Sequence, residues 1–191
     1  SSAHFAQRPD RDYARFDPTL RSLPGYKAGA IFRRTGGRHW IWSATGISES
    51  PGFEANDIGR LNSADSYTLN GDLRWRETEP GELLRGYWVG VSQNNEWTHG
   101  GDRQTKRLRF YSSQTWKNFW TTEASFNRDF RQADSRLTRG GPRMETPKRW
   151  SLNLELRNNQ ASATSWSGEL DIAGSEDGDL TRRFRGSLAF R

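Results

Sequence analysis

The chain has 191 residues, of which 29 are lysine or arginine and 23 are aspartate or glutamate, giving a formal net charge of +6 at pH 7. Only 32% of it is hydrophobic and its mean hydropathy is −0.99, and it holds no apolar run near the ~20 residues of a membrane-spanning helix. Disorder is excluded by the 13% of aromatic residues, because chains too polar to fold are poor in them. The absence of cysteine excludes disulfides and thiolate metal sites.

The first segment, residues 1–25, is polar and charged, so we expect a long loop there and antiparallel strands over residues 26–191, all in one domain. Tyr26 to Arg34 and His39 to Ser48 predict two strands joined by a hairpin, because the Gly36-Gly37 pair supplies the positive φ angles of a tight turn. Turn-forming residues then predict a loop from Ser50 to Asn62.

The clearest strand signal in the chain is the stretch from Tyr67 to Glu77. Successive side chains of a strand point to opposite faces, so strict alternation predicts one apolar and one polar face. A helix would spread both sets around its circumference. The apolar set is Tyr67, Leu69, Gly71, Leu73 and Trp75, and the polar set is Thr68, Asn70, Asp72, Arg74 and Arg76.

The same alternation predicts strands in the rest of the chain. Leu84 to Glu96, Lys106 to Ser113 and a strand containing Trp120 to Phe126 precede the longest irregular stretch, Asp129 to Lys148, which we expect to be a loop. Three more strands carry apolar sets, namely Trp150, Leu152, Leu154 and Leu156, then Trp166, Gly168, Leu170 and Ile172, then Phe184, Gly186, Leu188 and Phe190.

About nine strands, with short turns tending to alternate with longer loops and with tryptophan and tyrosine near strand ends, indicate an all-β antiparallel meander. We interpret it as a segment of a transmembrane β-barrel in the outer membrane of a Gram-negative bacterium, and as a fragment of a larger barrel. The expected lipid-facing residues are Tyr67, Leu69, Leu73, Trp75, Trp150, Leu152, Leu154, Leu156, Phe184, Leu188 and Phe190. The expected lumen-facing residues are Asn70, Asp72, Arg74, Arg76, Glu123, Asn153, Glu155, Arg157, Glu169 and Asp171.

This interpretation predicts a non-enzymatic protein without cofactor, serving passage, anchoring or surface display. Its expected partners are the lipid bilayer and, because open strand edges cannot face lipid, the remaining strands of the barrel or a partner chain. Two alternatives stay open. One is a soluble β-sandwich that binds glycans through exposed tryptophan, and the other is a glycan-active hydrolase.

Three local patterns could carry chemistry. Glu54, Asn56 and Asp57 offer oxygen ligands for Ca²⁺, but a turn is favoured because cation loops gather more oxygens, so no metal is expected. The carboxylates of Glu123, Glu155, Glu169 and Asp171 could pair for glycoside hydrolysis, but arginines within cross-strand reach favour neutralisation. The basic stripe from Arg103 to Arg109 suggests nucleic acid, but no nucleic-acid motif accompanies it and strand alternation explains it.

Four stretches resemble a known bacterial family: SSAHFAQRPD at Ser1 to Asp10, RFDPTLRSLPGY at Arg15 to Tyr26, SPGFEANDIG at Ser50 to Gly59, and LTRGGPRM at Leu137 to Met144. They are similar to the C-terminal β-barrel region of the domain of unknown function 5916. The resemblance implies an outer-membrane barrel with more strands on both sides. It also implies a family-9-like carbohydrate-binding module upstream, and hence glycans as a partner of the whole protein. It supplies no catalytic residues.

Overall fold

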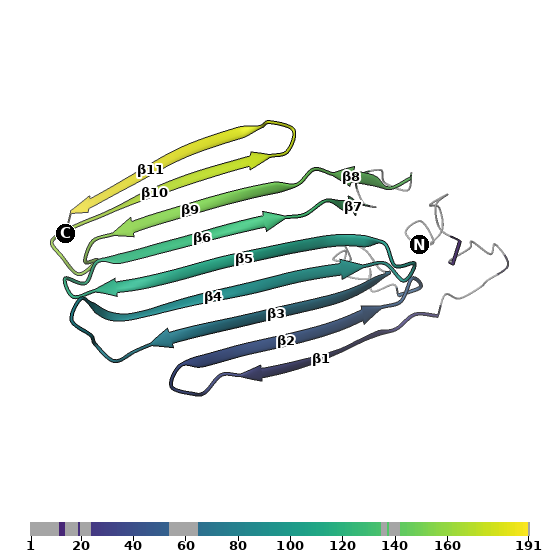
Figure 1. The fold of residues 1–191 in the computed structure, drawn as a ribbon, viewed down its shortest axis with the longest axis horizontal. Coiled ribbons are helices and arrows are strands. Elements are labelled where there is room, and N and C mark those ends of the chain that lie inside the picture. Colours follow the sequence, from purple (N-terminus) through teal and green to yellow (C-terminus); the bar gives the residue numbers. More distant parts are fainter. Residues whose placement is uncertain are drawn as a thin grey trace.

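The computed structural model describes residues 12–13, 19, 24–53, 65–134, 137 and 142–190. Within them the chain forms a nine-stranded antiparallel sheet in the order β1-β2-β3-β4-β5-β6-β9-β10-β11 and a two-stranded sheet, β7-β8 (Figure 1). The strands of the large sheet are β1 (Lys27–Arg34), β2 (Trp40–Glu49), β3 (Ser66–Glu77), β4 (Leu84–Trp97), β5 (Arg103–Trp116), β6 (Thr121–Asp129), β9 (Arg149–Arg157), β10 (Thr164–Ser175) and β11 (Leu180–Phe190). The prediction of an all-β meander of about nine strands is confirmed.

Each strand pairs with the next strand of the large sheet in an antiparallel ladder, which is regular except for register shifts at the two ends of the β4–β5 pair. Leu73 of β3, for example, lies opposite Trp42 of β2 and Val91 of β4. Residues directly opposite each other project from the same face, so this register aligns the apolar residues of neighbouring strands. The turn between β1 and β2 contains Gly37 at φ 132°, as the Gly-Gly pair predicted.

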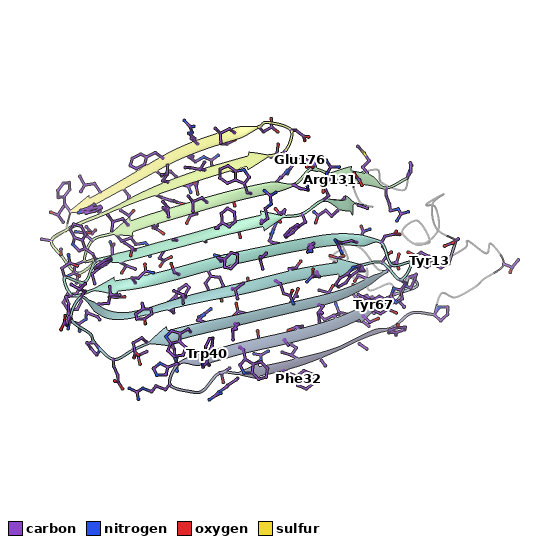
Figure 2. All side chains as sticks on the ribbon, viewed as in Figure 1. Tyr13, Phe32, Trp40, Tyr67, Arg131 and Glu176 are labelled. Atoms are coloured by element: carbon purple, nitrogen blue, oxygen red, sulfur yellow. The ribbon has the colours of Figure 1, made fainter. Side chains whose placement is uncertain are left out.

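The prediction of an unbroken loop from Asp129 to Lys148 is wrong. The main strand β6 ends at Asp129, but the short strands β7 (Gln132–Asp134) and β8 (Met144–Thr146) pair with each other. Three residues are too few to show an alternating pattern, so this pair left no signal in the sequence. It is joined to the large sheet through Gln132 of β7, whose Oε1 accepts a 3.1 Å hydrogen bond from the Lys106 amide of β5. The neighbouring Arg131 Nε donates a 2.7 Å hydrogen bond to Glu176 Oε1 in the turn after β10 (Figure 2).

The described strands form a single layer, and neither face of the large sheet is covered by a second sheet or by a helix (Figure 1). The side chains of Leu69, Leu73 and Leu154 are 47%, 41% and 39% exposed, and no large side chain among the described residues is fully buried. The two packed sheets of a β-sandwich are therefore not formed by these residues. The sheet is open, with β1 and β11 as its edges.

The two ends of the sheet differ in their connections. At one end the strands are linked by residues 35–39, 78–83, 117–120 and 158–163, and at the other by 50–65, 98–102, 130–148 and 176–179 (Figure 1). We call the first the short-turn end and the second, which has the two longest connections, the loop end. No helix in the described ranges has the length and apolar character needed to cross a bilayer.

Candidate functional site

One face of the sheet, which we call the apolar face, carries the residues expected to face lipid. The register places Leu152, Leu154 and Leu156 of β9 beside Phe126, Ala124 and Thr122 of β6. All eleven residues of the expected set project from this face, because the directly opposed partners of each lie an even number of residues from the other members of the set along every strand. At the β11 edge the exposed fractions of Phe184 and Phe190 both reach 74%.

Aromatic side chains border the apolar face at both ends. Trp40 and Trp75 lie opposite each other near the short-turn end with ring centroids 4.9 Å apart, and Tyr67 lies opposite Trp97 near the loop end (Figure 2). On β9 and β10 the same borders are formed by Trp150 and by Trp166, which packs edge-on against Trp120. Trp75 lies eight positions after Tyr67, a span of about 26 Å at ~3.3 Å per residue.

The aromatic borders run obliquely across the strands. Trp150 is aligned through Arg128, Leu108 and Gln93 with Gly71, which lies four residues beyond Tyr67 on β3. The loop-end border thus shifts by about one residue per strand between β3 and β9. With ~3.3 Å per residue and ~4.8 Å between strands, this shift corresponds to an angle of about 35° between the border and the perpendicular to the strands.

Polar residues interrupt the apolar face in its loop-end half. Gln93 and Asn95 of β4, Lys106 of β5, Arg128 of β6 and Arg182 of β11 project from this side. Lys106 places its Nζ 4.5 Å from the ring centroid of Phe130, outside the strand. Long cationic side chains can lay their stems along an apolar surface and carry the charge to its border.

The opposite side, the polar face, holds the predicted carboxylates in a network of ion pairs over β6, β9, β10 and β11. Arg157 Nε and Nη2 donate to the two Glu155 oxygens at 2.6 and 2.7 Å, and Glu123 lies 3.9 Å from the same guanidinium group. Arg185 bridges Glu169 and Asp171, to which Asn153 also donates at 2.9 and 2.8 Å. Every predicted carboxylate therefore has a cationic partner, which is the neutralised arrangement that the sequence favoured over a catalytic pair.

The other predicted polar-face residues lie on β3. Asn70 accepts a hydrogen bond from Asn94, and Asp72 accepts one from the Tyr111 hydroxyl. Arg74 and Arg76 project from the same face toward β4 and β5, where Arg74 stacks on Trp88 with 4.9 Å between the guanidinium carbon and the ring centroid. The basic stripe Arg103 to Arg109 is divided by strand alternation, so it presents no continuous charged surface.

The candidate Ca²⁺ ligands Glu54, Asn56 and Asp57 lie outside the described residues. Within the described part of the chain, no group of three or more His, Asp or Glu side chains is arranged to hold a metal ion.

Sequence reasoning missed a cluster at the loop end that joins Tyr13, Asp65 and His99. The Tyr13 hydroxyl donates to Asp65 Oδ2 at 2.6 Å, and Asp65 Oδ1 accepts the His99 amide at 3.0 Å. Asp65 is 3% exposed and has a φ of 72°, and the His99 ring packs on Tyr67 with centroids 4.1 Å apart. These residues are 52 and 34 positions apart, so only the folded register could reveal their contact.

The fold assigns the chain to a class of all-β proteins: a single-layer antiparallel meander with one apolar and one polar face. The chain belongs to the family described as Domain of unknown function (DUF5916), whose model matches residues 7–189. Comparison with curated proteins and with solved structures finds no significant match.

Proposed function

We propose that this chain is a non-enzymatic segment of an outer-membrane β-barrel, with its apolar face against lipid and its polar face lining a water-filled lumen. The observation that carries the proposal is the exposed apolar face bounded by two aromatic borders about 26 Å apart. Outer-membrane barrels have an outward apolar band ~25 Å tall between girdles of aromatic residues. A soluble protein would need another layer to cover this area.

The oblique course of the aromatic borders supports the same proposal. Strands in a barrel tilt from the barrel axis by ~35–45°, so a border that is level with the membrane deviates from the perpendicular to the strands by the same angle. The angle of about 35° obtained from the strand register falls within this range. A flat sheet facing a partner would have no reason to shift its aromatic borders by one residue per strand.

Closure requires strands besides those described. In an antiparallel meander the first and ninth strands run in the same direction, so β1 and β11 cannot close the sheet by antiparallel pairing. Their unpaired edges cannot face lipid, because unsatisfied backbone groups are costly there. The proposal therefore includes further strands of the same barrel or a partner chain between β1 and β11.

The proposal also orients the segment in the membrane. Outer-membrane barrels have short periplasmic turns and longer extracellular loops. The loop end would then face the cell exterior, and the short-turn end the periplasm. In this setting the segment serves passage, anchoring or surface display, and a role in carbohydrate handling would depend on a domain outside this chain.

Labelling of single cysteines tests the proposal directly, because the chain has none of its own. We would introduce Leu152→Cys and Asn153→Cys, which are neighbours on β9 with opposite faces, and treat the vesicle-bound protein with a water-soluble maleimide. The expected result is labelling of the cysteine at 153 but not at 152, and labelling of both after denaturation. Equal labelling of both in the vesicle-bound protein would refute the proposal.

A further inference from the structure

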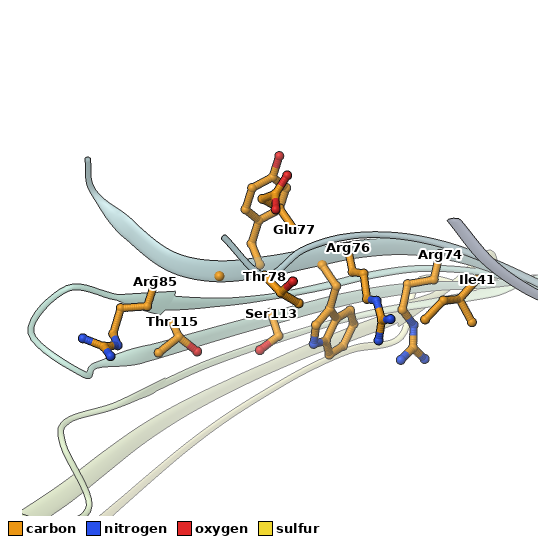
Figure 3. Close-up of a pocket in the computed structure, with 11 residues that line it drawn as sticks. Ile41, Arg74, Arg76, Glu77, Thr78, Arg85, Ser113 and Thr115 are labelled. Atoms are coloured by element: carbon orange, nitrogen blue, oxygen red, sulfur yellow. The ribbon is translucent and has the colours of Figure 1, made fainter. Parts of the chain in front are cut away.

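A cavity of about 420 Å³ opens on the polar face near the short-turn end, between β3, β4 and β5 (Figure 3). Its size falls within the range of ~300–1,000 Å³ typical of small-molecule sites. Three arginines, an indole and three aliphatic hydroxyl groups contribute to its lining: Arg74, Arg76, Arg85, Trp88, Thr78, Ser113 and Thr115. Figure 3 shows the three arginine side chains on one side of the ribbon and Glu77 on the opposite side.

The arginines of this cavity lack the carboxylate partners that the arginines of the ion-pair network over β6 to β11 have. Within the described residues no carboxylate oxygen lies within 4.0 Å of the guanidinium nitrogens of Arg74, Arg76 or Arg85. Arg157 and Arg185, at the other side of the sheet, are each paired with carboxylates. Three arginines without a carboxylate partner among the described residues are thus gathered in one cavity.

Aromatic rings hold two of these arginines in place. The guanidinium carbon of Arg74 lies 4.9 Å from the Trp88 ring centroid and 5.5 Å from that of Tyr111, and Arg85 lies 4.2 Å from the Phe119 centroid. A guanidinium group stacked on a ring keeps its in-plane N–H donors free for an oxyanion, which it binds through two parallel hydrogen bonds.

Burial adds a second reason for a ligand. The Nε atoms of Arg74 and Arg76 are buried and have no hydrogen-bond partner, while Arg76 Nη2 donates to the Gly37 carbonyl at 2.9 Å. A buried N–H donor without a partner is unfavourable, and an anion bound to the accessible part of the same guanidinium groups would offset this cost. The hydroxyls of Ser113 and Thr115 offer donors and acceptors to the neutral part of the same solute.

We propose that this cavity binds hydroxylated organic oxyanions, in which a carboxylate or phosphate group contacts Arg74 and Arg76 and sugar-like hydroxyls contact Ser113 and Thr115. The inference rests on the proposed function in one respect, namely that this face meets water inside the barrel. The site would lie at the periplasmic mouth of the lumen and would favour acidic over neutral solutes.

The test is equilibrium binding to the full 191-residue chain in detergent, measured by titration calorimetry at low salt with glucuronate, glucose 6-phosphate and glucose. Binding of glucuronate, of glucose 6-phosphate or of both at least about tenfold tighter than glucose is expected, since bidentate contacts to arginine distinguish charged from neutral solutes. The two anions separate a carboxylate from a phosphate source. Binding of all three with equal affinity, or of none, would overturn the inference.

Two double variants with the same change of charge locate the site. R74Q/R76Q should weaken anion binding by about tenfold or more, whereas R33Q/R183Q, which removes two arginines from the polar face of the edge strands, should change it by less than about twofold. Equal losses in both would mean general attraction to a basic surface and would overturn the site. Should R74Q/R76Q fail to fold, Arg85→Gln serves instead, and unchanged binding by that variant would count against the site.

The outcome is separable from the labelling experiment. If the cysteine at 152 reacted with maleimide in vesicles while the chain bound anions selectively, the anion site would be supported and the membrane assignment refuted. If labelling alternated between the two positions but no anion bound, the membrane assignment would be supported and the anion site refuted.

Discussion

Two glycines of the sheet lie directly opposite large aromatic residues, one on each face. Gly90 pairs with Tyr111 on the polar face, and Gly174 pairs with Trp150 on the apolar face. A Cβ atom added to Gly90 would lie 2.5 Å from Tyr111 Cζ, and one added to Gly174 would lie 2.8 Å from Trp150 Nε1. Each ring covers the backbone that the glycine leaves bare, an arrangement known to fix strand register.

We therefore expect Gly90→Ala to destabilise the protein by about 1–3 kcal/mol, because the methyl group would displace a ring that packs edge-on against Trp88 and whose hydroxyl donates a hydrogen bond to Asp72. Gly46→Ala is the matched control. Nothing lies within 4 Å of its added Cβ, so that substitution should be neutral or stabilising by up to ~1 kcal/mol. Urea-induced unfolding in detergent measures both. Similar effects of the two substitutions would contradict the pairing of Tyr111 with Gly90.

For the strands with clear alternation, the sequence could predict the face of each residue but not its partner. Alternation alone assigned Leu154 to one face and Glu155 to the other, and arginine content alone suggested that the carboxylates would be neutralised. That Glu155 pairs with Arg157 of its own strand, while Glu169 pairs with Arg185, depends on rotamers and cross-strand register. Likewise, the arginine cavity could not be predicted from the sequence, because it depends on the register that places β3 beside β4.

At the scale of elements, one ion-pair cluster ties the irregular segment after β6 to the turn between β10 and β11. Glu176 accepts hydrogen bonds from Arg131 Nε at 2.7 Å and from the Lys148 amide at 2.9 Å. The Arg131 hydrogen bond and, next, the Lys148 amide lower the pKa of the Glu176 carboxyl below its ordinary value of 4.5. The cluster lies in connections rather than in strands, so it restrains the loop end of the sheet.

This lowered pKa predicts an acid-sensitive contact. A carboxyl whose folded pKa is depressed adds stability that is present above its unfolded pKa and is lost as the pH falls through its folded pKa. Limited proteolysis of the 130–148 connection should therefore accelerate as the pH falls below about 4.5, and Glu176→Gln should be cut faster than the wild type at pH 7 with less further change on acidification. Glu82→Gln, at an exposed position without an ion pair among the described residues, should behave as the wild type. A pH response unchanged by Glu176→Gln would exclude the contact.

The elements themselves were largely accessible from the sequence. The strands with the strictest alternation, Tyr67 to Glu77 and Trp150 to Arg157, appear as β3 and β9 within one residue of their expected bounds. The predicted bounds of β5, Lys106 to Ser113, are too short, because the strand continues to Trp116. There Gln114, Thr115 and Trp116 break the apolar and polar order, and pairing with β4 and β6 extends the strand regardless.

At the scale of the whole molecule, the stability of the single-layer sheet depends on the medium or partner that covers its apolar face. A lipid bilayer and an aqueous partner surface differ in one measurable respect, because only a bilayer makes the cost of a charge depend on depth. Leu154 lies four residues from Trp150, midway between the aromatic borders, whereas Leu188 lies opposite Trp166 at the short-turn border. The two leucines thus offer the same side chain on the same face at two depths.

Replacing each leucine with arginine should separate these environments. Leu154→Arg is expected to cost about 2–4 kcal/mol and Leu188→Arg about 0–1 kcal/mol, since arginine is most unfavourable at the bilayer midplane and snorkels near the interface. Equilibrium unfolding from lipid vesicles measures both, and Ser125→Arg on the polar face controls for added charge. If Leu188→Arg were as costly as Leu154→Arg, burial would not vary with depth and the apolar face would belong against protein rather than lipid.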